Sequence, residues 1–278
     1  MSQENTPQFW DRLWRKPVSL EKDVFKVLRE ERLIRWQRIE ARVLRHFGGF
    51  DGLSVIEIGA GTGTNAALMG RRGARVTVLD YSPAALRRAA RLFERLHIRA
   101  DFIEGDALAP GEDLKGRHDV AMSFGLAEHF TGQQRRQIIG AHLDLVRAGG
   151  LAFVSVPNIA NPPYRIHKWI TERTRAWSVG EEYPFSRREL TDIAQSLGVR
   201  EYGFFGDSLW RSKRFLNPLK WLPRKTPKRA AGESSLSDGQ SPRRGFRRRL
   251  PRVEKGTRWD EYISYALVLW AAKLDKDR

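Results

Sequence analysis

The stretch that decides the fold spans residues 53–65 and reads LSVIEIGAGTGTN. A short apolar run breaks there into glycines at alternate positions, Gly59, Gly61 and Gly63, and a helix-compatible segment follows. Glycine tolerates the positive φ and the close backbone approach that a ligand-binding turn between a strand and a helix requires. The stretch therefore predicts a strand, a tight glycine turn and a helix, with a ligand held against the turn.

A second apolar segment, residues 74–79, ends in Asp80, which lies 21 residues after Gly59. In nucleoside-binding α/β folds an acid at this place binds the ribose hydroxyls. The dinucleotide fingerprint GxGxxG would need a third glycine at position 64, and this chain has Thr64 there. The spacing thus favours a nucleoside-containing ligand over a dinucleotide.

With Glu57 ahead of it, the GxGxG turn resembles motif I of the class I S-adenosylmethionine (SAM)-dependent methyltransferases. The resemblance covers roughly residues 50–205 and 260–272. It implies SAM as the cofactor, with its methionine part cradled by the turn and its ammonium oriented by Glu57, directly or through water. The turn residues expected to bind the cofactor are Gly59, Ala60, Gly61, Gly63 and Asn65.

The same resemblance implies contacts at the ends of three further strands. Asp80 would hold the ribose, with the ring of Tyr81 against adenine. After the third strand, Asp106 would accept from the adenine amine while the Ala107 amide faces a ring nitrogen; a helix or turn cap is the alternative role for Asp106. The fourth strand would add two cofactor contacts, Ser123 and Phe124.

The loop after the fourth strand carries the predicted catalytic pair, Glu128 and His129. Small-molecule methyltransferases of this class often have a Glu-His pair beside the sulfonium. Methyl transfer depends mainly on in-line positioning, and a base is needed only when the acceptor must lose a proton. His129 is the expected base, and Glu128 is expected to neutralise the sulfonium or hold acceptor hydroxyls. Purely structural roles, a backbone-bonded histidine and a helix-terminal charge, remain open for both.

Residues 161–164 read NPPY, which is the signature of adenine and glutamine N-methyltransferases. In those enzymes the tetrapeptide directly follows the fourth strand, whereas here it follows the fifth. We therefore expect a Pro-rich turn that lines the acceptor site at the rim of the cleft, away from the sulfonium.

From residue 53 onward, strand-like and helical segments alternate, which predicts right-handed βαβ crossovers and a parallel sheet. The α/β order resembles the Rossmann-like seven-stranded methyltransferase sheet, mostly parallel with the last strand antiparallel. Expected strands cover 53–58, 74–79, 99–103, 118–123, 150–156, 199–205 and 261–271, and expected helices cover 64–72, 83–96, 131–147 and 186–197.

Two helices are expected ahead of the sheet. A short amphipathic helix lies within residues 1–18, and a long helix begins after Ser19 as its N-cap, runs to about Phe47 and stops at Gly48-Gly49. The predicted organisation is an N-terminal helical cap (1–48), a SAM-binding core (49–205, with a cap insertion at 158–184), a basic amphipathic insertion, partly disordered (206–258), and a final core strand with a tail (259–278). We expect the cap, the insertion and residues 205–222 to build the acceptor pocket.

Cysteine is absent, which excludes disulfides, thiolate zinc sites and a thiol nucleophile; no feature of the sequence calls for a metal. The N-terminus is polar and acidic, so no signal peptide is visible. The longest apolar-rich run, residues 262–272, is too short to span a bilayer. A cytoplasmic protein is the expectation.

The formal charge of +17 is unevenly spread. Residues 224–258 hold 12 Lys/Arg against 3 Asp/Glu and few apolar residues, which predicts an exposed, poorly ordered insertion. Residues 210–222 interleave Trp and Leu with Arg and Lys. This composition suits the surface of an anionic membrane or, alternatively, RNA.

The sequence therefore predicts a SAM-dependent methyltransferase that acts on an oxygen or nitrogen of a small-molecule or lipid-type acceptor. An RNA methyltransferase that holds nucleic acid with residues 210–258 is the alternative. A partner subunit with the same fold but without catalysis is a third, weaker interpretation, against which the intact glycine, Asp80 and Asp106 set argues.

Overall fold

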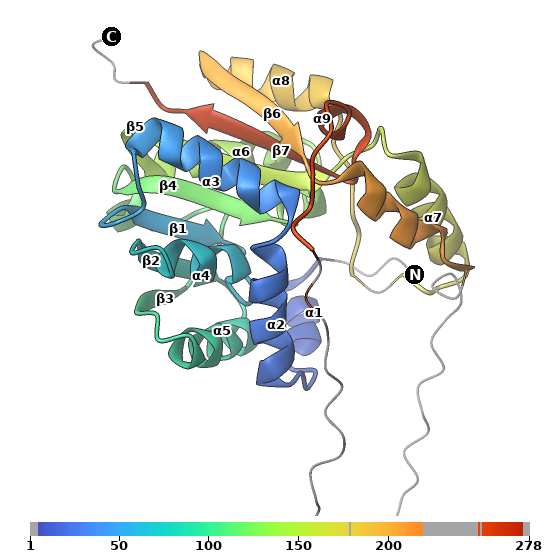
Figure 1. Cartoon of the computed structure of the whole chain (residues 1–278), viewed down its shortest axis with the longest axis horizontal. Helices are drawn as coiled ribbons and strands as arrows, with labels where there is room; N and C mark the ends of the chain where they lie inside the picture. Colours follow the sequence, from blue (N-terminus) through green and yellow to red (C-terminus); the bar gives the residue numbers. More distant parts are fainter. Residues whose placement is uncertain (1–4, 178, 219–249, 251, 275–278) are drawn as a thin grey trace, which may run out of the picture.

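The computed structural model describes residues 5–177, 179–218, 250 and 252–274. Its centre is a seven-stranded sheet of order β3-β2-β1-β4-β5-β7-β6 (Figure 1). Strands β1 to β5 are parallel, and β7 runs antiparallel between β5 and β6. The expected sheet is confirmed, with strands β1 (Ser54–Ile58), β2 (Arg75–Asp80), β3 (Ala100–Glu104), β4 (His118–Phe124), β5 (Val146–Pro157), β6 (Glu201–Gly206) and β7 (Ala266–Ala272).

Helices cover both faces of the sheet, so the molecule has three layers (Figure 1). Successive strand residues such as Val55 and Ile56 point to opposite faces and enter two separate apolar clusters. One face is covered by α2 (Leu20–Glu30), α3 (Ile34–Phe47), α4 (Thr64–Gly70) and α5 (Pro83–Arg95), and the other by α6 (Gln133–Leu145) and α8 (Arg187–Ser196).

The remaining elements include α1, α7 and α9, which lie near the carboxyl ends of the parallel strands, where loops of an open α/β sheet form ligand sites (Figure 1). Helix α7 packs against η3, and α1 packs against α5. These elements are α1 (Pro7–Trp14), η1 (Glu112–Leu114), η2 (Ala127–His129), α7 (Pro162–Arg173), η3 (Leu209–Leu216) and α9 (Asp260–Ile263).

The prediction of one long helix from Ser19 to Phe47 is wrong, because the chain breaks between α2 and α3. Residues around Glu254 cross the break: its amide donates to the Arg32 carbonyl at 2.9 Å and its carboxylate accepts from the Ile34 amide at 3.2 Å. A distant segment thus replaces the helical hydrogen bonds that the break removes. The stop at Gly48 is confirmed, with a φ of 80°.

Two other predicted boundaries need correction. Helix α6 ends at Leu145, so Arg147 lies in β5 and not in the last turn of a helix. The final strand begins at Ala266, later than expected, because Asp260 starts the short helix α9. The Asp260 carboxylate accepts from the amides of Leu209 and Thr257 at 3.0 and 2.7 Å, which ties this helix to η3.

Most of the basic segment 224–258 lies outside the described residues, so the prediction of an exposed, poorly ordered insertion stays a prediction. Within the described ranges, no helix combines the length and apolar character needed to cross a membrane.

Candidate functional site

The glycine turn forms as expected at the end of β1. Gly59 and Gly61 have φ values of 56° and 57°, a region that L side chains rarely adopt. A methyl group on Gly59 would lie 2.5 Å from Leu126, and one on Gly61 would lie 2.3 Å from the Trp14 ring. Both positions therefore need glycine for conformation and for space.

Asp80 fastens the turn to β2. Its carboxylate accepts from the Gly61 amide at 2.8 Å and from the Ser82 amide at 2.9 Å, and the residue is buried. Burial raises the pKa of Asp80, while the two backbone donors oppose the shift. Each carboxylate oxygen keeps a second lone pair for a ligand hydroxyl.

A cavity of about 490 Å³ opens over this turn, and we call it the outer cavity. Most of the predicted cofactor contacts line it, together with Trp10 and Trp14 of α1, which the sequence placed only on an amphipathic helix. Asp106 is exposed and also accepts from the Leu108 amide at 2.9 Å, so it has the turn-capping role that was left open. The predicted residues that line the outer cavity are Gly59, Ala60, Gly61, Asp80, Tyr81, Asp106, Ala107, Phe124 and His129.

A second cavity, of about 210 Å³, adjoins the first, and we call it the inner cavity. Four residues line both cavities: Lys26, Ala60, Phe124 and Gly125. The other residues around the inner cavity are mainly polar, namely Glu30, Arg35, Glu57, Thr64, Asn65, Glu128, Ser155, Val156, Pro157, Tyr265 and Ala266.

Glu57 and Asn65, at the two ends of the glycine turn, both line the inner cavity. Glu57 accepts from the Ala66 amide at 2.7 Å, and burial raises its pKa to about 7. Asn65 is 4% exposed, and its Oδ1 atom has no hydrogen-bond partner. Unpartnered buried acceptors are costly, so this one indicates a ligand donor.

Two predicted cofactor residues lie away from both cavities. Ser123 is fully buried on the α6 side of the sheet, where its hydroxyl lies 2.9 Å from Nε2 of His142. Burial lowers the pKa of His142 to about 4, so the ring is neutral and its Nε2 atom accepts a hydrogen bond from the Ser123 hydroxyl. Gly63 is the N-cap of α4 and faces Phe93 in the core. The position of Ser123 along β4 decides to which face of the sheet its side chain points. The sequence resemblance alone did not reveal that face.

The predicted catalytic neighbours face different cavities. His129 lines the outer cavity, and its Nδ1 donates to the Glu181 carbonyl at 2.7 Å, which leaves Nε2 as the acceptor nitrogen. Burial lowers the pKa of His129. Glu128 lines the inner cavity, and its Oε2 atom has no partner.

Glu182 stands behind Glu128 and was not predicted. It accepts from the Tyr164 hydroxyl at 3.0 Å. Burial raises the pKa of Glu128 well above its ordinary value, with the like charge of Glu182 adding to the shift, and burial raises the pKa of Glu182 to about 7. One ligand atom each of Glu128, His129 and Glu182 lie within 4.8 Å of one another, a spacing that a divalent cation could also bridge.

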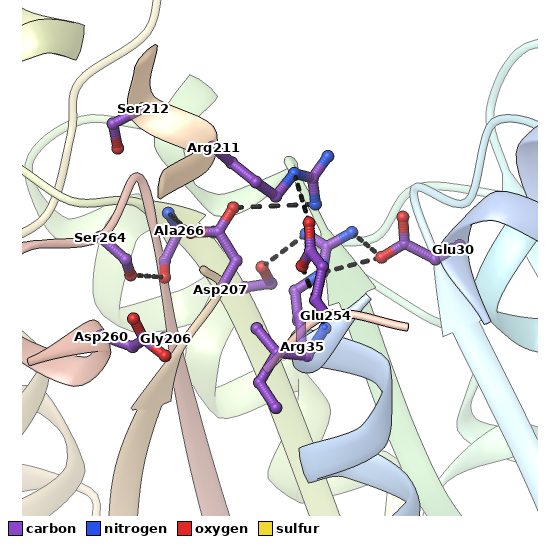
Figure 2. A network of polar contacts seen from close by, with 12 residues as sticks. Glu30, Arg35, Gly206, Asp207, Arg211, Ser212, Glu254, Asp260, Ser264 and Ala266 are labelled. Carbon is purple, nitrogen blue, oxygen red and sulfur yellow. Dashed lines mark hydrogen bonds and ion pairs between the residues drawn. The ribbon is translucent and has the colours of Figure 1, made fainter. Parts of the chain in front are cut away.

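An ion-pair network forms the wall of the inner cavity next to α2 and α3 (Figure 2). Arg35 pairs with Glu30 and donates to the Ser155 hydroxyl at 3.3 Å. Burial opposes ionisation of Glu30, but the Arg35 charge outweighs it and lowers the Glu30 pKa. Behind them, Arg211 lies 3.9 Å from both Asp207 and Glu254. Helices α2 and α3 thus supply one wall of the inner cavity through Lys26, Glu30 and Arg35.

The NPPY segment does not line either cavity, contrary to expectation. Asn161 is the N-cap of α7, with its side chain accepting from the Tyr164 amide at 2.8 Å and donating to Ser212 and to the Ile263 carbonyl, each at 2.7 Å. These bonds bring α7, η3 and α9 together. The tetrapeptide therefore has a structural role, since Asn161 connects these three elements.

Comparison with known proteins agrees with this geometry. Residues 55–150 match the family model described as a methyltransferase domain. The ubiquinone biosynthesis O-methyltransferase of Shewanella pealeana is 32% identical over 116 residues, 40% of this chain and 46% of that protein. Its counterpart in Leptothrix cholodnii is 30% identical over 135 residues, 48% of this chain and 55% of that protein. The chain spans about half the length of these curated relatives.

Among solved structures, the chain is similar to the magnesium protoporphyrin IX methyltransferase of Synechocystis with bound S-adenosylhomocysteine (SAH). The TM-score is 0.55 at 15% identity, covering 96% of this chain and 93% of that chain, which shows a shared fold. Residues 55–150 thus match a methyltransferase domain, and the glycine turn and the sheet order agree with that match.

Proposed function

We propose that the protein transfers a methyl group from SAM to an oxygen or nitrogen of a small-molecule acceptor. The observation that carries this proposal is the junction of two cavities at Ala60, Phe124 and Gly125. The outer cavity offers the acids and rings that suit adenosine, and the inner cavity offers an enclosed polar space. A sulfonium at the junction would face an acceptor in the inner cavity.

In this proposal the adenosine lies in the outer cavity. Asp80 holds the ribose with its free lone pairs, Tyr81 lies against adenine, and Asp106 and the Ala107 amide bind the base edge. Glu57, at the end of β1, faces the methionine part from the inner cavity.

The transfer itself is an in-line displacement. A lone pair of the acceptor atom forms the new bond to the methyl carbon, the carbon–sulfur bond breaks, and the sulfur keeps the electron pair as SAH. If the acceptor carries a proton, a side chain must take it. His129 lines the outer cavity and Glu128 lines the inner cavity, and these two side chains are the candidates for that base.

The names of the relatives support oxygen as the acceptor atom, because ubiquinone biosynthesis O-methyltransferases methylate oxygen by name. The polar lining of the inner cavity supports an acceptor whose reacting end is small and polar. We also propose that residues 1–48 act as a cap over the cofactor, since Trp10, Trp14 and Lys26 all border the outer cavity.

Association with a membrane surface is a further part of the proposal. It is supported by exposed apolar side chains on the packed pair α7 and η3: Ile166, Trp169, Trp210 and Leu216 are 49, 57, 61 and 51% exposed. Basic residues accompany them, with Lys213 over the Trp210 ring and Arg173 over Trp169. The strongly basic residues 219–249 follow in the sequence but lie outside the described residues.

The function is tested by methyl transfer from radiolabelled SAM into separate fractions of cell extract: small polar molecules, lipids and RNA. We expect the wild-type protein to place label in a small polar or lipid fraction. The Asp80→Ala variant should lose this labelling. Label in RNA alone would replace the proposal with the RNA methyltransferase interpretation. Absence of transfer into every fraction, with SAH bound, would support the non-catalytic interpretation.

A further inference from the structure

A third cavity, of about 430 Å³, lies between η3 and the chain just before α9, and we call it the side cavity. The residues that line it come from two stretches of chain, within 208–211 and within 254–257. No described residue of the side cavity also lines the outer or the inner cavity. The side cavity is therefore a separate space from the one proposed for the cofactor and the acceptor.

The guanidinium of Arg211, which lines the side cavity, forms no hydrogen bond with any residue that the structure describes. Only 17% of the Arg211 side chain is exposed. It pairs with two acids, Asp207 and Glu254, but each lies 3.9 Å away, beyond hydrogen-bond distance (Figure 2). Leaving the N–H donors of a mostly buried guanidinium unbonded is costly. The side cavity gives Arg211 the space to bind a ligand that is rich in acceptor oxygens.

The two acids beside Arg211 are held in place by backbone amides. Asp207 accepts from the Ala266 amide at 3.1 Å, and Glu254 accepts from the Ile34 amide at 3.2 Å. Burial raises the pKa of both carboxyl groups, and the charge of Arg211 opposes each shift. Because these amides fix the two carboxylates, the donors of Arg211 stay available to a further anion.

Two more basic side chains accompany Arg211. Arg214 follows three residues later on η3, and side chains at this spacing share one face of a 3₁₀ helix. Arg214 contacts the rings of Phe215 and Tyr265, but it has no hydrogen bond and no ion pair within the described part of the chain. Burial lowers the pKa of Arg214, and the like charge of Arg211 adds to the shift. Lys255, which is exposed, lines the side cavity from the other stretch of chain.

We propose that the side cavity binds a phosphate group, held by the guanidinium of Arg211 and the ammonium of Lys255. A guanidinium bonds two phosphate oxygens at once, and a lysine adds a mobile point charge. Trp210, 61% exposed, also lines the cavity and offers an apolar surface to the rest of the ligand. The ligand is a soluble phosphate ester or the headgroup of a phospholipid. This site goes beyond the proposed methyl transfer and does not depend on it.

Calorimetric titration of the full chain with inorganic phosphate and with α-glycerophosphate tests the site. The wild type should bind both probes, and Arg211→Gln should weaken that binding roughly 10- to 100-fold, the range for one charge-assisted hydrogen bond. Arg211→Lys keeps the charge beside Asp207 and Glu254 but loses the planar fork, so its affinity should lie between those two proteins. Lys255→Gln should weaken binding roughly two- to fivefold and bind SAH as the wild type does.

Arg188→Gln is the matched control, because the Arg188 side chain on α8 is 92% exposed and lines none of the three cavities. It removes the same charge as Arg211→Gln and should bind the soluble probes as the wild type does. If Arg211→Gln does not fold, Arg211→Lys and Lys255→Gln are compared with this control instead.

Sedimentation with phosphatidylcholine vesicles, with and without phosphatidate, distinguishes the two sources of the phosphate group. Binding of the soluble probes that Arg211→Gln weakens identifies a soluble ester. Binding confined to phosphatidate vesicles, and weakened by Arg211→Gln more than by Arg188→Gln, identifies a lipid headgroup. If the wild type binds none of these probes, or if the side-cavity variants and the control behave alike in both assays, the inference is overturned.

Discussion

At the scale of single residues, burial does much of the chemical tuning in this site. Glu57, Glu128 and Glu182 are enclosed around the inner cavity, and burial raises the pKa of each. A carboxyl group with a pKa near 7 can exchange a proton at neutral pH, which a solvated glutamate does poorly. Their environment therefore matters as much as their identity.

The first prediction concerns ribose recognition by Asp80. Asp80→Ala removes the carboxylate that would bind the ribose hydroxyls, so SAH affinity should fall at least about tenfold. Because Asp80 also bonds the Gly61 and Ser82 amides, the folded state is checked by circular dichroism. An unchanged dissociation constant would rule out the ribose assignment.

A second prediction separates the two proton acceptors. With the acceptor found by the labelling experiment, replacement of the true base should lower turnover by roughly 10²–10⁴-fold while SAH binding is retained. His129→Ala and Glu128→Gln are compared side by side. A large loss in one variant names the base, and losses under about threefold in both would mean that positioning alone drives the transfer.

A third prediction follows from the Glu128–Glu182 pair. The pKa of Glu182 rises from 4.5 to about 7 on folding, so the folded protein holds its proton more tightly than the unfolded chain does. Stability should therefore fall as pH rises from about 4.5 to 7, and stay level above that range. Glu182→Gln keeps an acceptor for Tyr164 but cannot ionise, so at pH 8 it should be more stable than wild type by on the order of 1–3 kcal/mol.

Thermal unfolding at pH 5 and pH 8, with a chelator present, measures this effect. Glu94→Gln, at an exposed position on α5, serves as the control and should behave as wild type. If Mg²⁺ or Zn²⁺ stabilises the wild type but not Glu182→Gln, the trio with His129 holds a cation and the shared-proton account is wrong.

At the scale of secondary-structure elements, α1 contacts both the glycine turn after β1 and the loop that carries His129. Trp14 lies against the glycine turn, and Trp10 meets the His129 ring edge-on at 4.7 Å between centroids. Asn5, just before the helix, donates to the carbonyls of His129 and Glu181 at 3.1 and 2.9 Å. The amphipathic pattern predicted this helix, but only the tertiary structure reveals that its tryptophans border the cofactor site.

A fourth prediction tests that contact. Gly61→Ala would place a methyl group 2.3 Å from Trp14 and strain a backbone with φ of 57°, so SAH affinity should fall and the protein should lose stability. Gly116→Ala is the matched control, because Gly116 has φ of 67° but nothing within 4 Å. It should cost only the strain, about 1–2 kcal/mol, and leave SAH binding intact. Equal effects of the two substitutions would mean that Trp14 does not matter.

Helix boundaries show where local patterns fail. The sequence between Ser19 and Phe47 is helical throughout in its periodicity, yet Glu254, more than 200 residues away, stabilises the break between α2 and α3. Ser82 shows the opposite case: it is the N-cap of α5, a role set by neighbouring residues, and its side chain accepts from the Ala85 amide at 3.2 Å.

At the scale of the whole molecule, the glycine turn and the alternation of strands and helices predicted the parallel sheet, and the resemblance to the methyltransferase sheet predicted its final antiparallel strand. The turn and the alternation did so because periodicity and turn chemistry are local properties. Lys26, Arg35 and Glu182 carry no local signal, since their roles arise only when α2, α3 and the 158–184 insertion fold against the strand ends. Most residues that line the inner cavity were therefore not predicted from the sequence.

A fifth prediction concerns the molecule as a unit. The exposed apolar side chains of α7 and η3, with the basic residues around them, should bind anionic liposomes, by about 1 kcal/mol for each basic residue near the surface. Trp169→Ser combined with Trp210→Ser should weaken sedimentation with anionic vesicles and leave SAH binding unchanged. Full-length protein that ignores such vesicles but holds RNA with a steep salt dependence would contradict the membrane proposal.

We propose that this chain binds SAM at the junction of its two cavities in order to transfer a methyl group. The most direct test is calorimetric titration of the full chain with SAH, repeated with Asp80→Ala. We expect one binding site per chain, weakened at least about tenfold by the substitution. No detectable binding of SAH by the folded wild type, or equal binding by wild type and variant, would contradict it.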